Sequence, residues 1–217
     1  MKKYLAFLTF LLFVATFRAA AQTPHITLVR SGSEPSYDAL LTKLKRGDLG
    51  IDFKALRLKY SETKDYTPEG LRPELRDQMY KAMNEKRYSD ARALAEDVLK
   101  TNFVDISAHL VAGMANEALG DTAKFEFHKQ VFSGLISSIM DDGDGQSREN
   151  AFTVISIPEE YAVLDYLRLT RDKQFSASGD GHMYDVFSVT DKESGGTLKL
   201  YFNTDIIWKT RSRSSKN

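Results

Sequence analysis

Cysteine is absent from the 217 residues, which excludes disulfides, thiol catalysis and thiolate metal ligands. An excess of charge of either sign is absent too, because 30 basic residues balance 30 acidic ones. A nucleic-acid or anionic-membrane partner needs a concentrated positive field, so neither is expected. Glycine-rich phosphate loops are missing as well, and no cofactor is expected.

The first 21 residues have the composition of a cleavable secretory signal peptide. Lys2 and Lys3 form its charged start, and Tyr4–Phe17 is an apolar run of 14 residues. This run is shorter than the roughly 20 residues of a membrane-spanning helix. Ala19 and Ala21 occupy the small-residue positions before a cleavage site. We therefore expect an exported protein, periplasmic or secreted, with no membrane span after cleavage and, without cysteine, no lipid anchor.

Cleavage removes three basic residues, so 27 basic and 30 acidic residues remain and the mature chain is mildly acidic. The apolar period then divides this chain into two regions. Over residues 22–140 the apolar residues recur at three and four, which predicts helices, whereas residues 141–217 are strand-rich. We predict an α+β fold, with tetratricopeptide-like helical hairpins followed by a small antiparallel sheet with one packed helix.

Two helical hairpins in register are the most informative pattern of the first region. A turn at Lys86 and Arg87 follows one predicted helix, and Gly120, which follows a later one, lies 34 residues after Lys86. An offset of about 34 residues is the tetratricopeptide period. An unrelated packing of four helices is the alternative, because stacked repeats usually need three units. Before the hairpins, Ser36 and Asp52 are expected to cap two further helices.

The second region opens with an acidic, turn-rich linker and continues with short apolar runs. Strands are predicted at residues 151–157, 173–178, 183–189 and 198–202. Pro158 is expected to open a helix, since proline fits the first turn of a helix. The basic residues of the C-terminus lie among serines, so this end is predicted to be frayed.

Several segments spread over the chain resemble a known family. They are Tyr37–Leu41, Ile51–Arg57, the hairpin around Tyr88, Gly143–Ser147, Val154–Ser156 with Glu159–Tyr161, and Tyr201–Ile206. Through them the chain resembles an uncharacterised family of exported Bacteroidota proteins, the domain of unknown function 4919 (DUF4919). The resemblance covers nearly all of the sequence after residue 21. It implies a location in a Gram-negative envelope and carries no activity with it.

The acidic turn Asp141–Gly145 offers carboxylates to a hard cation, with Asp142 and Asp144 as candidate calcium ligands. The spacing does not match an EF-hand, because a loop starting at Asp142 would need glutamate at its twelfth position, which is Thr153. The histidines also lack the spacing of metal ligands. A plain turn between the two regions explains the acidic residues, and no metal is expected.

Three residues of the second region are candidates for catalysis: Glu160, Asp180 and His182. Glu159 and Glu160 are adjacent, so on a helix they point about 100 degrees apart and cannot face one sugar from opposite sides. Glu160 could act with a distant acid such as Asp180 or Asp185. First-turn carboxylates that complement the helix dipole explain Glu159 and Glu160 without any function. His182 lies in a tight turn, where functional residues are frequent.

Two classes of function remain open on the sequence alone. The sequence favours a non-enzymatic envelope component that binds another protein or a peptide, through the concave helical face or the groove between the two regions. The alternative is a hydrolase or sugar-binding domain in the C-terminal half, with Glu160, Asp180 and His182 as its polar residues. A purely structural or stress-related envelope protein is a third possibility.

Overall fold

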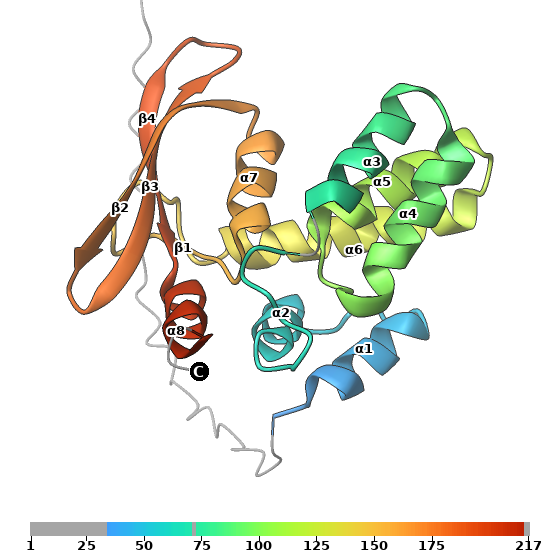
Figure 1. The fold of residues 1–217 in the computed structure, drawn as a ribbon, viewed down its shortest axis with the longest axis horizontal. Coiled ribbons are helices and arrows are strands. Elements are labelled where there is room, and N and C mark those ends of the chain that lie inside the picture. The colour runs from blue at the N-terminus through green and yellow to red at the C-terminus, as the bar shows by residue number, and fades with distance from the viewer. Residues whose placement is uncertain (1–33, 71–72, 215–217) are drawn as a thin grey trace, which may run out of the picture. The chain divides into compact units, whose positions relative to one another are not determined.

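Figure 1 shows the computed structural model, which describes residues 34–70 and 73–214. The predicted signal peptide, residues 1–21, lies outside the described residues. Pro35–Asn217 form one compact unit. None of the helices in the described ranges combines the length and the apolarity that a bilayer span requires.

A series of helices forms the first part of this unit. They are α1 (Tyr37–Lys45), α2 (Phe53–Tyr60), α3 (Pro73–Asn84), α4 (Tyr88–Thr101), α5 (Ile106–Ala118) and α6 (Thr122–Met140). Helices α3 and α4 pack together as one hairpin, α5 and α6 as the next, and α4 packs on α5. Helix α2 packs on both α1 and α6. The predicted succession of helices is therefore present, and its two hairpins lie side by side (Figure 1).

Side-chain caps fix where several of these helices begin. In each, the capping oxygen accepts the N–H three residues later: Ser36 from Ala39 (3.3 Å), Asp52 from Ala55 (2.8 Å), Asp105 from Ala108 (2.9 Å) and Asp121 from Lys124 (3.1 Å). Such caps satisfy N–H groups that have no partner inside the helix. The predicted caps at Ser36 and Asp52 are confirmed.

The second part of the unit contains the sheet and two more helices. Its elements are β1 (Phe152–Thr153), α7 (Ile157–Tyr166), β2 (Leu169–Gly179), β3 (His182–Asp191), β4 (Thr197–Asn203) and α8 (Asp205–Ser214). The strand order is β1-β4-β3-β2. Strands β2, β3 and β4 are antiparallel, and β1 pairs in parallel with β4. The predicted α+β fold is confirmed, but the sheet is mixed and not purely antiparallel, because the predicted first strand pairs in parallel, and α8 is an additional helix.

The turn between β2 and β3 brings two candidate residues to one end of the sheet. Gly179 pairs with His182, so Asp180 and Gly181 alone form the turn. Their φ angles are 54° and 82°, both in the left-handed region. Two consecutive residues with positive φ define a type I′ turn, whose twist matches the flanking strands and which favours Asp-Gly. The Asp-Gly pair therefore explains why the hairpin turns at this point.

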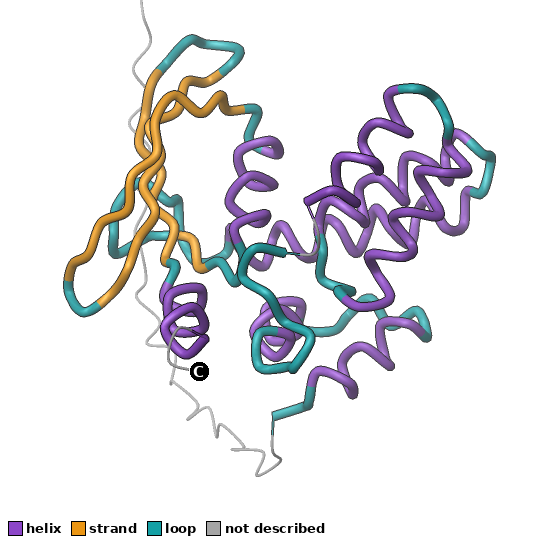
Figure 2. The backbone as a smooth tube through the Cα atoms, in the orientation of Figure 1, coloured by secondary structure: helices purple, strands orange, loops and turns teal. Residues whose placement is uncertain are grey.

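The two faces of the sheet contact different parts of the molecule. Phe187 and Val189 of β3 belong to the main core, which also includes the helices. Tyr184 and Val186 form a smaller cluster with Ala151 on the opposite face, because neighbouring strand residues alternate in direction. Helix α7 contacts both β2 and α5, so it lies between the sheet and the hairpins (Figures 1 and 2).

The strand predicted at residues 151–157 is shorter than expected. Only Phe152 and Thr153 pair as β1, and α7 already begins at Ile157, with Pro158 in its first turn. Ser156 directly precedes α7 with extended backbone angles, so the apolar residues before it serve as a connection. Val154 and Ile155 are nevertheless buried. The apolar run therefore correctly indicated burial and overestimated strand length.

The C-terminal end is a helix over the described residues, so the prediction of a frayed end is wrong. Helix α8 begins at Asp205, and Ile207 within it is 2 % exposed against the main core. Arg211 Nε donates a hydrogen bond to Glu69 Oε1 at 2.9 Å. The apolar anchor at Ile207 stabilises this helix although its remaining residues are largely polar.

Candidate functional site

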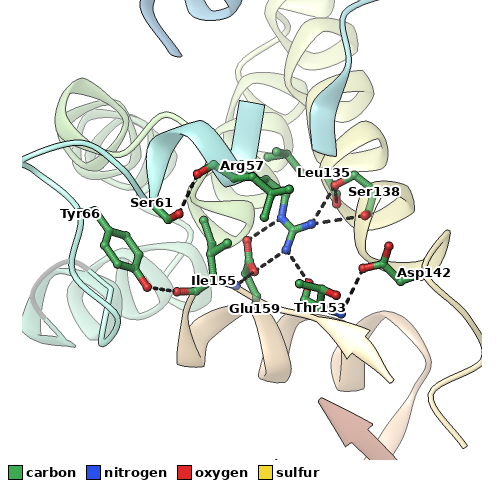
Figure 3. A network of polar contacts seen from close by, with 10 residues as sticks. Arg57, Ser61, Tyr66, Leu135, Ser138, Asp142, Thr153, Ile155 and Glu159 are labelled. Carbon is green, nitrogen blue, oxygen red and sulfur yellow. Dashed lines mark hydrogen bonds and ion pairs between the residues drawn. The ribbon is translucent and has the colours of Figure 1, made fainter. Parts of the chain in front are cut away.

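A buried ion pair joins the helices to the second part of the unit. Arg57 on α2 is 1 % exposed, and it donates two hydrogen bonds to Glu159 on α7, from Nε at 2.8 Å and from Nη2 at 2.7 Å. Its other donors reach Ser138 on α6 and the Thr153 carbonyl oxygen. The Ile155 N–H donates to Glu159 Oε2 at 2.8 Å. Both charges therefore have the partners that burial requires, and Figure 3 shows the guanidinium at the centre of them.

The acidic turn that follows α6 is occupied by contacts within the protein. Asp142 forms an ion pair with Lys54, and its second oxygen accepts the Thr153 N–H at 3.2 Å. Asp144 accepts the Gln146 N–H at 2.9 Å within the turn itself. In the part of the chain that the structure describes, no group of three or more His, Asp and Glu side chains is placed to hold a metal ion.

Glu160 directly follows Glu159, but its surroundings differ. Its side chain is fully buried, and neither carboxyl oxygen has a hydrogen-bond partner. Burial raises the pKa of Glu160 to about 9, and the nearby carboxylate of Asp185 on β3 adds to the increase. Asp185 itself accepts hydrogen bonds from Ser176 at 2.7 Å and Gln174 at 3.3 Å, both on β2. Glu160 is therefore a neutral acid at pH 7, packed between α7 and the sheet.

A polar cleft of about 570 Å³ lies on the other face of the sheet. Its lining residues are Asp142, Arg148, Glu149, Ala151, Thr153, Asp180, His182, Tyr184 and Asn203. Tyr184 lines the cleft, whereas its neighbour Asp185 faces Glu160, since neighbouring strand residues point to opposite faces. Two of the three catalytic candidates, Asp180 and His182, thus share the cleft. Glu160 does not reach it, and of the two candidate calcium ligands only Asp142 lines it.

His182 is held in the cleft by α8. Its Nδ1 lies 2.6 Å from Asp205 Oδ2, and Asp205 Oδ1 accepts the Met183 N–H at 2.8 Å. Burial opposes ionisation of Asp205, but the hydrogen bonds from His182 and Met183 hold its pKa below the ordinary value. Because a carboxylate only accepts, Nδ1 carries the proton of this hydrogen bond and Nε2 is left available to the cleft.

An apolar groove of about 170 Å³ lies among α3, α5, α6 and α7. Its lining residues are Tyr80, Ile106, Ser107, Leu110, Phe132, Ala162, Asp165 and Tyr166. The rings of Phe132 and Tyr166 are 6.3 Å apart, so α6 and α7 contact each other through aromatic side chains here. Asp165 is the charged member of this lining. Desolvation raises the pKa of Tyr80, so its hydroxyl remains protonated at the edge of the groove.

Two buried histidines form a pair that sequence spacing did not indicate. His109 on α5 and His128 on α6 approach each other at 3.0 Å between their Nδ1 atoms. His109 Nε2 lies 3.0 Å from the Phe103 carbonyl oxygen, which accepts only, so His128 supplies the proton between the two rings. Burial, with the charge of His128, lowers the pKa of His109 to about 3, and burial also lowers the pKa of His128.

Sequence reasoning also missed Arg57, although a signal for it exists. Phe53, Leu56, Arg57 and Tyr60 have the spacing of one helical face, so Arg57 stands on an otherwise apolar face. A charged residue on such a face is either exposed at an edge or paired when buried. No local pattern identifies its partner, because Glu159 lies 102 residues away in sequence.

The fold and these sites define an α+β protein in which a helical part and a part with a small mixed sheet are joined by a buried ion pair between α2 and α7. The chain belongs to the family described as domain of unknown function (DUF4919), whose model matches residues 27–213. The resemblance to the domain of unknown function 4919 is thus confirmed. No curated protein matches the chain, and no solved structure matches it either.

Proposed function

We propose that this protein is a non-enzymatic binding component of the Bacteroidota cell envelope that holds a segment of another protein in the apolar groove. One observation carries the proposal. The groove presents large apolar side chains from three helices, Tyr80 at 36 %, Leu110 at 37 % and Tyr166 at 54 % exposure. Apolar side chains gathered in one exposed hollow are typical of interaction sites, whereas isolated ones are ordinary.

The lining also specifies the chemistry of the segment. The groove is small enough that its occupant inserts apolar side chains and does not bury a whole domain. Its single charge, on Asp165, favours a lysine or arginine next to the inserted residue. The matching ligand is therefore a short peptide segment that combines an apolar anchor with a basic neighbour.

The helical hairpins support this function if they form a tetratricopeptide-like unit, as we propose. The first helices of the two hairpins, α3 and α5, both contribute to the groove. Stacked helix pairs create concave surfaces of this kind, and they use atypical terminal helices as caps. Helices α1 and α2 precede the hairpins and suit that capping role.

The proposed location depends on the sequence of residues 1–21, which have the features of a signal peptide. Cleavage after Ala21 gives a mature chain that starts at Gln22, located in the periplasm or outside the cell. The binding experiment uses this mature chain, and the N-terminal mass of the protein recovered from a Bacteroidota host checks its start.

The test is selection of peptides from a random display library on the mature protein. We expect selected peptides to share an apolar anchor beside Lys or Arg, and Leu110→Glu to weaken their binding at least tenfold. Leu119→Glu is the matched control, since Leu119 is 41 % exposed near the end of α5 and does not line the groove. Peptides without a shared pattern, or with equal affinity for both variants, would show that the groove is not the binding site.

A further inference from the structure

The polar cleft on the far face of the sheet has walls that are fixed before any ligand arrives. On one side, the loop that follows Asp142 is closed by hydrogen bonds from the Gly145 N–H to Asn150 at 2.8 Å and from the Tyr201 N–H to Gly145 at 2.7 Å. Gly145 has φ 71°, and an added Cβ would lie 2.3 Å from the Phe152 ring. On the other side is the type I′ turn of β2 and β3. Preformed walls reduce the entropy that a ligand loses on binding.

The cleft is lined by both hydrogen-bond donors and hydrogen-bond acceptors. Asp180 is an acceptor, and Arg148 and the amide of Asn203 are donors. The orientation of Asn203 is fixed, because its Oδ1 accepts the Asp205 N–H at 3.0 Å and its NH₂ is left for other contacts. The hydroxyl groups of a ligand both donate and accept, so they can bond to both sets of groups.

Arg148 lies next to an aromatic ring of the cleft. Its guanidinium lies 5.9 Å from the centroid of the Tyr184 ring, and an added Cβ on Gly179 would lie 2.3 Å from its Nη1. Within the described residues no hydrogen bond or salt bridge engages this guanidinium. This cation–π contact keeps the guanidinium near the Tyr184 ring and leaves its N–H donors available to a ligand.

The charged residues of the lining restrict the class of ligand. Asp142, Glu149 and Asp180 oppose an anion, although Arg148 is present. Both oxygens of Asp142 already have protein donors, and no described group of carboxylates is placed to hold a metal ion. A neutral ligand with many hydroxyl groups is not repelled by these carboxylates and does not need a set of metal ligands.

We propose that this cleft binds a neutral carbohydrate, independently of the apolar groove. Binding without cleavage is the expected activity, because glycoside hydrolysis needs a carboxyl that stays protonated near pH 7. The pKa of Glu149 is lowered by hydrogen bonds from its own N–H and from Ser147. Glu160, whose pKa is raised, lies on the opposite face of the sheet.

The experiment is a titration of the mature protein with neutral trisaccharides (maltotriose, cellotriose and triacetylchitotriose), followed by NMR chemical shifts and calorimetry. We expect saturable binding of at least one of them, with the shifts centred on His182 and Asn203. Asp180→Asn removes the charge and keeps a residue that tolerates positive φ, and we expect it to weaken binding at least tenfold. Arg148→Met is expected to act in the same way.

Glu193→Gln is the matched control, because Glu193 lies in the other hairpin turn and forms an exposed ion pair with Arg168. It should leave carbohydrate binding unchanged, and so should Leu110→Glu in the groove. The proposal is overturned if no trisaccharide binds, if inorganic phosphate or spermidine binds more tightly than each sugar, or if binding survives both cleft variants. Circular dichroism of each variant establishes that it is folded.

Discussion

Helix α7 carries two buried glutamates on different sides, one charged and paired with an arginine, the other neutral and without a hydrogen-bond partner. On the side towards α2 and α6, Glu159 accepts two hydrogen bonds from Arg57. Arg57 also donates a hydrogen bond to the Ser138 hydroxyl, and the ion pair is buried. Towards the sheet, Glu160 has no donor and faces Asp185, so a bound proton neutralises it. The two residues are neighbours in the chain, so the difference comes from the elements packed against them. Burial of a glutamate therefore does not by itself indicate its charge.

The largest loss of stability is expected from removal of Arg57, because Glu159 would then be a buried glutamate without a partner, as Glu160 is. Arg57→Met leaves Glu159 buried without its cation, and the expected loss is about 3–5 kcal/mol of unfolding free energy. Urea denaturation followed by circular dichroism measures this loss.

The control for this substitution is the double variant Arg57→Met with Glu159→Met. Replacement of both partners by apolar residues of similar size removes the unpaired charge, so the double variant should regain part of the stability. A double variant less stable than the single one would contradict the assignment of the loss to an uncompensated charge.

Substitution of Glu160 is expected to change stability by less, and to raise it where loss of Arg57 lowers it. Its pKa is about 9 in the folded protein and 4.5 as an unperturbed group, so its stabilising contribution is complete below pH 4.5 and is lost as the pH rises towards 9. Glu160→Gln stays neutral, and we expect it to gain about 2 kcal/mol relative to the wild type at pH 8. Denaturation curves between pH 5 and pH 9 measure the difference.

Glu159→Gln is the matched control for this experiment, because it makes the same chemical change one residue earlier. It should destabilise the protein at every pH, since Arg57 loses its counter-ion. If both substitutions raised the unfolding free energy, or both lowered it, the two glutamates would not differ in charge as proposed.

The smallest change in stability is expected for the buried histidine pair, in which both rings are neutral. The pKa of His109 falls to about 3 on burial, so the stability of the pair is complete above pH 6.5 and is lost as the pH falls towards 3. Between pH 6.5 and 5.5 we expect the wild type to lose about 1–2 kcal/mol. The double variant His109→Leu with His128→Leu should lose less over this range, and thermal unfolding at several pH values compares them. Equal slopes would contradict protonation of the pair.

Local chemistry made much of the fold predictable. Each correctly predicted feature depends on residues close together in sequence. These features are the caps at Ser36 and Asp52, the hairpin turn at Asp180 and Gly181, and the change of apolar period after residue 140. The short length and parallel pairing of β1, and the presence of helix α8, were not predicted, and for a different reason. Whether these segments form strand or helix depends on packing against β4 and the main core, which propensity does not describe.

The sites were predictable only in part. Asp180 and His182 were found because turn residues at a hairpin end lie at the surface, and the structure brings both to one cleft. Glu160 was assigned to the same group, but alternation along β3 places its neighbour Asp185 on the other face of the sheet. The burial of Arg57 could have been inferred from its apolar helical face, but its partner Glu159 is 102 residues away and no local pattern identifies it. The histidine pair likewise depends on how α5 packs against α6.

The separation of Arg57 from Glu159 also affects how the chain folds. The two residues are 102 positions apart, so their contact closes a large loop and cannot form early through local structure. During synthesis, Arg57 emerges long before its acceptor. A helical region that buried this guanidinium beforehand would enclose an unpaired charge, so its final packing has to wait for α7. Completion of the chain is in this way coupled to closure of its core.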